Sequence, residues 1–213
     1  MLKTRIAVLV SGGGTNLQAL IDACNEGIIS SGSIELVIAS NRKAYALERA
    51  ANAGIKTAVA SKKDLSSQQK FEEEIERLLT ENDIDLIVMA GFMSILTKNF
   101  TDKYPGKIIN IHPSLIPSFC GKGFYGLHVH EAALRYGVKV TGATVHYVNE
   151  IPDGGRIIMQ KAVEVKPGDT PEVLQKRVME EAEWKILPRA VELISRKMAE
   201  AKSDSLKIKD NKR

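Results

Sequence analysis

Short apolar runs alternate with amphipathic stretches through the first half of this 213-residue chain. The apolar runs cover residues 5–10, 35–39, 86–90 and 107–111, and their length and composition predict buried strands. Between them, apolar residues recur at helical spacing, for example over residues 17–21 and 71–79. Strands that alternate with helices indicate right-handed crossovers, so we predict an open, mostly parallel, doubly wound α/β sheet of the Rossmann-like type.

The second half has a different pattern. Residues 140–148 and 156–165 are both strand-like, and a tight Pro-Asp-Gly-Gly turn region joins them. Two strands connected so closely must run antiparallel. A long helix is then predicted from Thr170, which can cap it, and Pro171, which suits its first turn. Its apolar stripe continues to Ile194, with a bend expected at Pro188.

The apolar pattern fades at about Ala199. We therefore expect one domain over residues 1–198, followed by a disordered polar tail over residues 199–213. The length of the chain fits one domain with a full hydrophobic core.

Charge and cysteine content exclude several classes of protein. The net charge is only +4, with both signs interspersed, and no basic, aromatic-rich face predicts nucleic-acid binding. The apolar run at residues 6–10 is too short for a secretory signal, so we expect a cytoplasmic protein without a membrane segment. Cys24 and Cys120 have neither metal-site nor disulfide spacing, and we expect no metal. The sequence leaves a monomer and a homodimer equally open.

A glycine loop, Ser-Gly-Gly-Gly-Thr-Asn, connects the first strand to the first helix at residues 11–16. Backbone N–H groups at such a helix start favour a phosphate, and Gly13 and Gly14 would allow its close approach. The alternative of a dinucleotide fingerprint fails because Leu17 stands where Gly or Ala is needed. A nucleoside triphosphatase loop fails because no Gly-Lys-Ser/Thr follows. A tight turn without a ligand remains the simpler alternative.

Asn110 and His112 lie at the end of the last predicted parallel strand, with Pro113 and Ser114 directly after them. Because side chains alternate along a strand, Asn110 and His112 point to the same side. Asp153, on the later turn, can join them only through tertiary packing. An amide, an imidazole and a carboxylate are suited to holding an oxyanion and moving a proton. Each also has a structural alternative: a strand-end amide, a core histidine and a turn residue.

These motifs resemble a known family when they are taken together and in order. The glycine loop, Ala-Gly-Phe-Met at 90–93, Asn-Ile-His-Pro-Ser-Leu-Ile-Pro at 110–117, Thr-Gly-Ala-Thr-Val-His at 141–146 and Asp-Gly-Gly at 153–155 are similar to those of phosphoribosylglycinamide formyltransferases. The resemblance covers about residues 5–194. It implies a single folate-dependent formyltransferase domain that transfers a formyl group from 10-formyltetrahydrofolate to glycinamide ribonucleotide in purine synthesis.

The resemblance also implies roles for individual residues. Asn110, His112 and Asp153 match the catalytic residues. The other matched positions are expected to bind the ribonucleotide, at Gly13, Gly14, Thr15, Asn16 and Glu183, or the folate, at Met93, Ser94, Ile95, Leu96, Asn110, Glu150, Ile151, Pro152, Asp153 and Gly154. The chain departs from the family pattern at Ser94, where many members have Arg, at Trp184, where many have His, and in a longer loop at 119–126.

The expected mechanism is a direct attack of the neutral amine on the formyl carbon. Asn110 and His112 would stabilise the oxyanion, while Asp153 would favour the protonated form of His112 and help to move the amine proton. The rival functions are a formyl-folate hydrolase, another formyltransferase and a non-catalytic phosphate sensor. The chain length favours the ribonucleotide enzyme over the first two, which are expected to carry a further domain, and a sensor would leave the Asn-His-Asp set unexplained.

Overall fold

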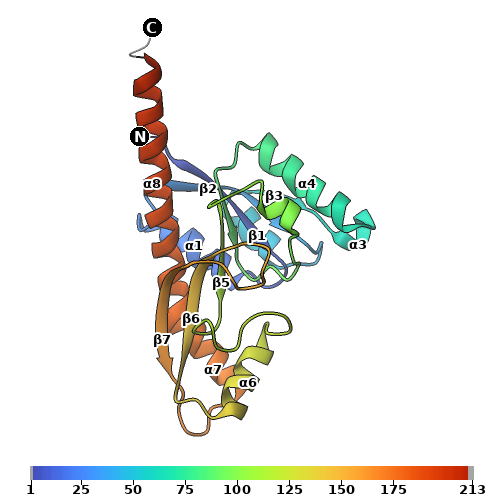
Figure 1. Ribbon diagram of the computed structural model, residues 1–213, viewed down its shortest axis with the longest axis vertical. Helices are drawn as coiled ribbons and strands as arrows, with labels where there is room; N and C mark the ends of the chain where they lie inside the picture. The colour runs from blue at the N-terminus through green and yellow to red at the C-terminus, as the bar shows by residue number, and fades with distance from the viewer. Residues whose placement is uncertain (1, 211–213) are drawn as a thin grey trace.

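A seven-stranded sheet forms the centre of the molecule in the computed structural model, which describes residues 2–210 and their side chains as far as Asp204 (Figure 1). The strand order is β3-β2-β1-β4-β5-β6-β7. The strands are β1 (Thr4–Val10), β2 (Gly32–Ala39), β3 (Lys56–Val59), β4 (Leu86–Met89), β5 (Ile108–His112), β6 (Val140–Tyr147) and β7 (Ile157–Glu164).

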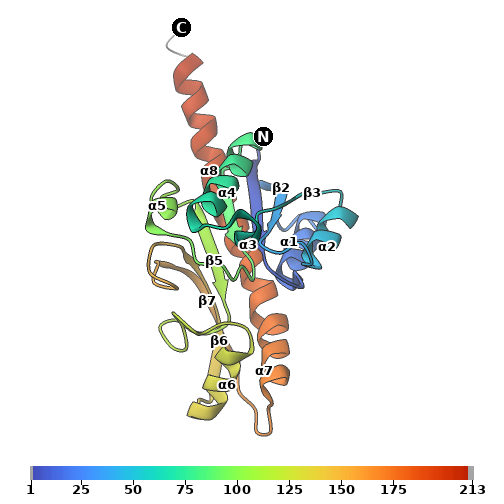
Figure 2. The same cartoon turned by 90° about the vertical axis from the view of Figure 1, so that its right-hand side faces the viewer.

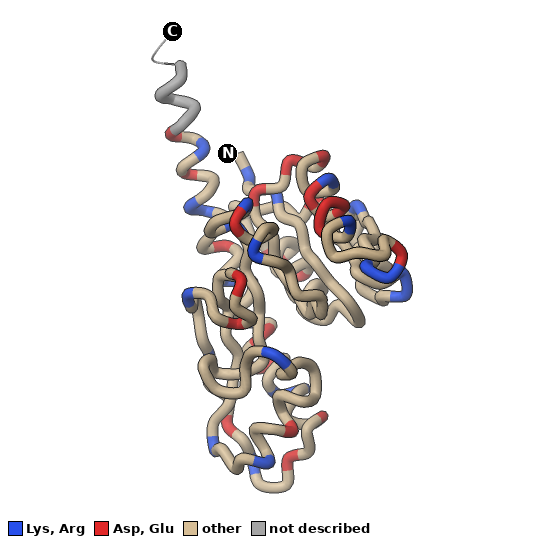
Figure 3. Tube along the Cα trace, turned by 45° about the vertical axis from the view of Figure 1, so that its right-hand side comes forward, with Lys and Arg blue, Asp and Glu red and all other residues tan. Residues whose placement is uncertain are grey.

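Helices follow most of the strands and cover both faces of the sheet (Figures 1 and 2). They are α1 (Thr15–Asn25), α2 (Ala46–Asn52), α3 (Lys62–Leu65), α4 (Gln68–Glu81), α5 (Lys98–Thr101), α6 (Leu127–Tyr136), α7 (Pro171–Val178), the π-helix η1 (Met179–Glu183) and α8 (Trp184–Asp210). Acidic and basic residues both occur along outer helices such as α4 (Figure 3).

The sheet confirms the predicted architecture. Strands β3, β2, β1, β4 and β5 are parallel, while β6 is antiparallel to both β5 and β7. Strand β3 has no counterpart among the predicted strands, because this four-residue edge strand is exposed or only half-buried and lacks an apolar run. The predicted antiparallel pair of residues 140–148 and 156–165 corresponds to β6 and β7.

Two hydrophobic cores lie on opposite faces of the sheet. In β1, Ile6, Val8 and Val10 belong to the core formed with α1 and α8, whereas Ala7 and Leu9 belong to the core formed with α4. All five side chains are fully buried. Alternating side chains on a strand that is covered on both sides explain why its sequence is continuously apolar.

The predicted long C-terminal helix is one continuous helical segment with an irregular centre. It comprises α7, then one turn of π-helix in η1, then α8. Thr170 caps it through the Val173 N–H, and Pro171 occupies the first turn as predicted. The π-helical turn lies upstream of the bend expected at Pro188 and ends directly before Trp184. Proline has no backbone N–H, so Pro188 cannot donate the helical hydrogen bond to the carbonyl of Trp184.

The structure differs from the expected disordered tail. Helix α8 continues to Asp210 and extends past the sheet beside the N-terminus (Figures 1 and 2). Ala199 is buried, and the ammonium of Lys202 lies 2.5 Å from the carboxylate of Asp85. These contacts hold the start of the predicted tail against the body, which a fading apolar pattern does not reveal. Residues 211–213 lie outside the described part of the chain.

Candidate active site

A cavity of about 730 Å³ lies where the parallel strands end. Three segments that follow parallel strands meet on its wall: the glycine loop after β1, residues 90–96 after β4, and the end of β5. Ligands in open α/β sheets bind at this edge, beyond the carboxyl ends of the strands. The topology therefore brings together the motifs that the sequence separates.

The register between β5 and β6 places three polar side chains side by side. Asn110 is paired with His146, and His112 is paired with Thr144. Because Asn110 and His112 lie on one side of β5, both face the cavity. The amide nitrogen Nδ2 of Asn110 lies 3.2 Å from Nε2 of His146, whose Nδ1 donates to the carbonyl of Tyr147.

Asp153 lies between the two histidines. Its Oδ2 is 3.4 Å from Nδ1 of His112, and its Oδ1 is 3.5 Å from Nε2 of His146. Oδ2 also accepts a hydrogen bond of 2.8 Å from the backbone N–H of Gly121. The structure thus brings the predicted amide, imidazole and carboxylate together and adds a second imidazole to them.

The turn that carries Asp153 has a strained backbone. Asp153 has φ of +56°, a conformation that is uncommon for residues other than glycine. Two residues on, a Cβ at Gly155 would lie 1.7 Å from the carbonyl oxygen of Tyr147, so only glycine fits. Positive φ at functional positions is a known form of stored strain, and here it aims the carboxylate at the two histidines.

The charge balance at Asp153 favours its ionised form. Burial raises the pKa of this carboxyl, but the contact with His146, the nearby His112 and the Gly121 N–H together hold the pKa below its usual value. The carboxylate is therefore charged at neutral pH, as required for a group that receives or steers a proton.

The protonation state of His112 differs from the expected one, in which Asp153 keeps the ring protonated. Burial lowers its pKa, and although Asp153 and the Phe119 carbonyl raise it, the net shift is downward. Nε2 of His112 donates to that carbonyl at 2.9 Å, so the neutral ring carries its proton on Nε2. The expected direction of the Asp153 effect is correct, but burial outweighs it.

The glycine loop and η1 form one end of the cavity. Gly13, Gly14, Thr15 and Asn16 all line the wall there, and Asn16 Nδ2 donates to Glu183 Oε2 at 2.5 Å. Glu183 is buried, and burial raises its pKa to about 7, with the Asn16 hydrogen bond opposing the shift. All five residues predicted to bind the ribonucleotide are thus in one place.

An apolar surface forms another part of the wall. Met93, Ile95 and Ile151 are 53%, 61% and 58% exposed, which is high for large apolar side chains. Ser94, Leu96, Glu150 and Pro152 line the same cavity. Gly154, which was also expected to bind the folate, is not on the wall, and its N–H donates to the carbonyl of Ile151. The apolar surface suits a flat, partly aromatic ligand.

Several residues on the wall were not among the predicted site residues. His146 is one of them, and the sequence signal for it is its position on a strand that leads into the Asp153 turn. His130 is fully buried, neither ring nitrogen has a partner among the described residues, and burial lowers its pKa to about 4. Gly121 and the Phe119 carbonyl come from the loop at 119–126, where no sequence pattern indicates a contact with Asp153 or His112.

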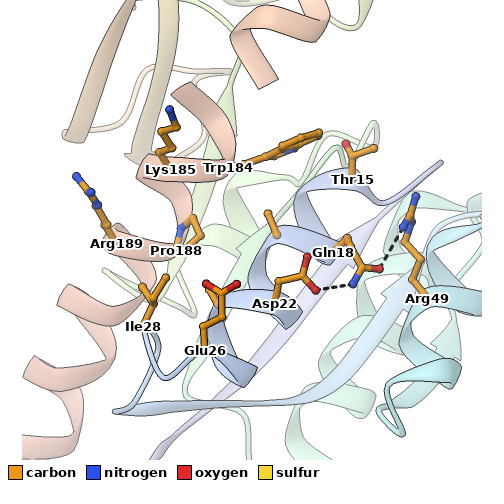
Figure 4. Close-up of a pocket in the computed structure, with 12 residues that line it drawn as sticks. Thr15, Gln18, Asp22, Glu26, Ile28, Arg49, Trp184, Lys185, Pro188 and Arg189 are labelled. Carbon is orange, nitrogen blue, oxygen red and sulfur yellow. Dashed lines mark hydrogen bonds between the residues drawn. The ribbon is translucent and has the colours of Figure 1, made fainter. Parts of the chain in front are cut away.

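A second, smaller cavity of about 390 Å³ lies between α1 and α8 (Figure 4). Trp184 and Pro188 come from α8, Gln18 and Asp22 from α1, and Arg49 from α2. Arg49 donates to Gln18, which in turn donates to Asp22, as the dashed lines show. Thr15 lines both cavities, so the smaller cavity adjoins the end of the glycine loop.

Residues 2–210 contain no helix that is both long and apolar enough for a membrane span. Within the same range, no three His, Cys, Asp or Glu side chains are grouped in a way that could hold a metal ion. Cys24 and Cys120 are both free, and burial raises the pKa of each thiol.

The fold and the site together define a class. The formyl transferase family model matches residues 4–191, which is most of the chain. The chain belongs to this family.

The chain is also similar to individual proteins. It is 42% identical to the phosphoribosylglycinamide formyltransferase of Haemophilus influenzae over 207 residues, which cover 97% of this chain and 91% of that protein. It is 47% identical to the human trifunctional purine biosynthetic protein adenosine-3 over 91% of this chain, but spans only 18% of that relative. The crystal structure of glycinamide ribonucleotide transformylase 1 from Symbiobacterium toebii superposes with a TM-score of 0.85 at 41% identity, covering 91% of this chain and 88% of that one.

Proposed function

We propose that this protein transfers the formyl group of 10-formyltetrahydrofolate to the amino group of glycinamide ribonucleotide, a step of purine synthesis. The products are formylglycinamide ribonucleotide and tetrahydrofolate. The observation that carries the proposal is the convergence of Asn110, His112 and Asp153 on one cavity wall, with the glycine loop on the same wall. A formyltransferase named for this ribonucleotide is similar over nearly the whole chain.

The geometry supports direct attack of the amine on the formyl carbon. A new C–N bond forms, the carbonyl oxygen gains negative charge, and the amine nitrogen becomes positive. The Asn110 amide is a donor that can stabilise this oxygen, and His112, once it takes up a second proton on Nδ1 beside Asp153, adds a positive charge near it. Both lie on the cavity side of β5, and His146 contacts the Asn110 amide.

We assign the transfer of the amine proton to Asp153. As the tetrahedral species collapses, the bond from the formyl carbon to the folate nitrogen breaks, and the amine proton must reach that nitrogen. The ionised carboxylate, between His112 and His146, can accept or steer the proton through water. It also stabilises His112 if that ring becomes protonated as charge develops.

The two ends of the cavity suit the two substrates. The glycine loop at the start of α1 supplies backbone N–H groups for the phosphate, and Glu183 supplies a carboxyl for sugar hydroxyls. The surface of Met93, Ile95 and Ile151 suits the rings of the folate. The substrates would then meet at Asn110 and His112.

We also propose that the protein acts in the cytoplasm on small-molecule substrates alone, as a monomer or homodimer. The mixed charge of the chain, without a basic, aromatic-rich face, supports the restriction to small-molecule substrates. Cell fractionation and light scattering would test it.

A spectrophotometric assay with the purified protein tests the function. Tetrahydrofolate formation should require both formyl folate and glycinamide ribonucleotide. Release of tetrahydrofolate without the amine would favour a hydrolase instead. Binding of the ribonucleotide without binding of folate in calorimetry would favour a phosphate sensor.

A further inference from the structure

Lys122 is the one lysine or arginine on the wall of the large cavity, within the part of the chain that the structure describes. It lies in the loop between β5 and α6, flanked by Gly121 and Gly123, which have φ of +88° and +94°. The ammonium has no hydrogen-bond or ion-pair partner among the described side chains, and the residue is exposed. A free cation therefore borders the cavity.

The other charged residues that the structure describes on this wall are acidic. Glu150, Asp153 and Glu183 line the same cavity, and Asp153 is held in its charged form. Both substrates of the proposed reaction are nevertheless anions, because glycinamide ribonucleotide carries a phosphate and formyl folate ends in the carboxylates of its glutamate. Carboxylates on the wall repel both substrates, so a cation on the same wall has a clear electrostatic role.

Two backbone contacts, both made by residues just before Lys122 in the chain, fix this loop to the reacting centre. The carbonyl of Phe119 accepts from His112, and the N–H of Gly121 donates to Asp153. Lys122 directly follows Gly121, so its long side chain starts beside Asp153. From that position it can reach an anionic group of a substrate bound against Asn110 and His112.

We propose that Lys122 binds an anionic group of the bound substrates, as a specificity-determining residue of the transfer. The folate carboxylates are favoured, since the phosphate already has the glycine loop, where Arg49 also donates to the Gly13 carbonyl at 2.9 Å. This assignment rests on the proposed function. The contact would be the same for either substrate, because an ammonium pairs with a carboxylate or a phosphate through charge-assisted hydrogen bonds.

Steady-state kinetics of Lys122→Gln, Lys122→Glu and Lys122→Arg test the assignment. For Lys122→Gln, we expect the KM for formyl folate to rise about threefold to tenfold, with kcat within about twofold of the wild type. Lys122→Glu should raise the KM further, and Lys122→Arg should restore it. The effect of Lys122→Gln should shrink at high salt.

Lys139→Gln is the matched control, because Lys139 is exposed and lies on neither cavity wall. It should leave both KM values unchanged. A rise in the KM for the ribonucleotide instead of the folate would assign the contact to the phosphate and retain the proposal. Unchanged KM values for both substrates in Lys122→Gln and Lys122→Glu would overturn it. A wild-type protein without formyl transfer would contradict the proposed function itself, a separate result.

Discussion

Asn110 and His146 face each other across the antiparallel pair of β5 and β6, with 3.2 Å between Nδ2 of Asn110 and Nε2 of His146. The same ring nitrogen is 3.5 Å from Asp153. His146 therefore contacts both the proposed oxyanion donor and the proposed proton acceptor. Groups that hold catalytic side chains in place can affect turnover without reacting themselves.

Replacement of His146 should consequently lower kcat more than it changes either KM. We expect His146→Leu to reduce kcat by roughly tenfold or more, because Asn110 and Asp153 each lose a polar neighbour. His146→Gln retains a side-chain amide and should recover part of the loss. Equal kcat values for His146→Leu and the wild type would remove His146 from the site.

Glu183 should make stability depend on pH between its unfolded and folded pKa values. Burial raises the folded pKa from 4.5 to about 7, so between these values the folded state binds a proton that the unfolded state has lost. The free energy of unfolding should therefore fall as pH rises through this window, by at most about 3 kcal/mol. Urea unfolding at pH 5 and pH 8 measures it.

The matched variant is Glu183→Gln, which cannot titrate and can still accept from Asn16. It should lose less stability than the wild type over the same pH interval. It should also bind glycinamide ribonucleotide more weakly. An identical pH dependence in the two proteins would show that Glu183 does not titrate as assigned.

Thr144 holds the segment that follows His112. Its hydroxyl donates to the Ser114 carbonyl at 2.7 Å and accepts from the Ile116 N–H and from Gln160. Thr144→Val keeps the shape but leaves these groups unsatisfied, so we expect a loss of about 1 to 3 kcal/mol in the free energy of unfolding.

Thr141 provides the control for this substitution. It lies in the same strand and is buried, but its hydroxyl has no partner among the described residues. Thr141→Val should therefore be neutral or stabilising. If the two substitutions had equal cost, the hydrogen bonds of Thr144 would not be the cause.

Local patterns predicted the central sheet well, because buried strands such as β1 have continuous apolar sequence. They also placed Asn110 and His112 on one side of β5. They could not predict β3, which is short and exposed, or the contacts of Phe119 and Gly121, which arise from loop folding. The position of Asp153 likewise depends on tertiary packing, and only the family resemblance connected it to His112.

The protonation of His112 is another property that residue type and neighbours alone could not give. Asp153 acts in the expected direction, but the depth of burial decides the net shift of the pKa. The same holds for α8, where contacts of Ala199 and Lys202 extend the helix beyond its apolar stripe.

Turnover of Asn110→Ala and His112→Ala in the formyl-transfer assay, with both substrates saturating, is the sharpest test of the roles assigned to Asn110 and His112. Loss of one oxyanion donor typically costs about 2.7 to 4 kcal/mol in the transition state, so kcat should fall by roughly a hundredfold or more for Asn110→Ala, with a large loss for His112→Ala as well. Both variants should keep the wild-type fold by circular dichroism. Near-normal turnover in both would contradict the assignment of this site.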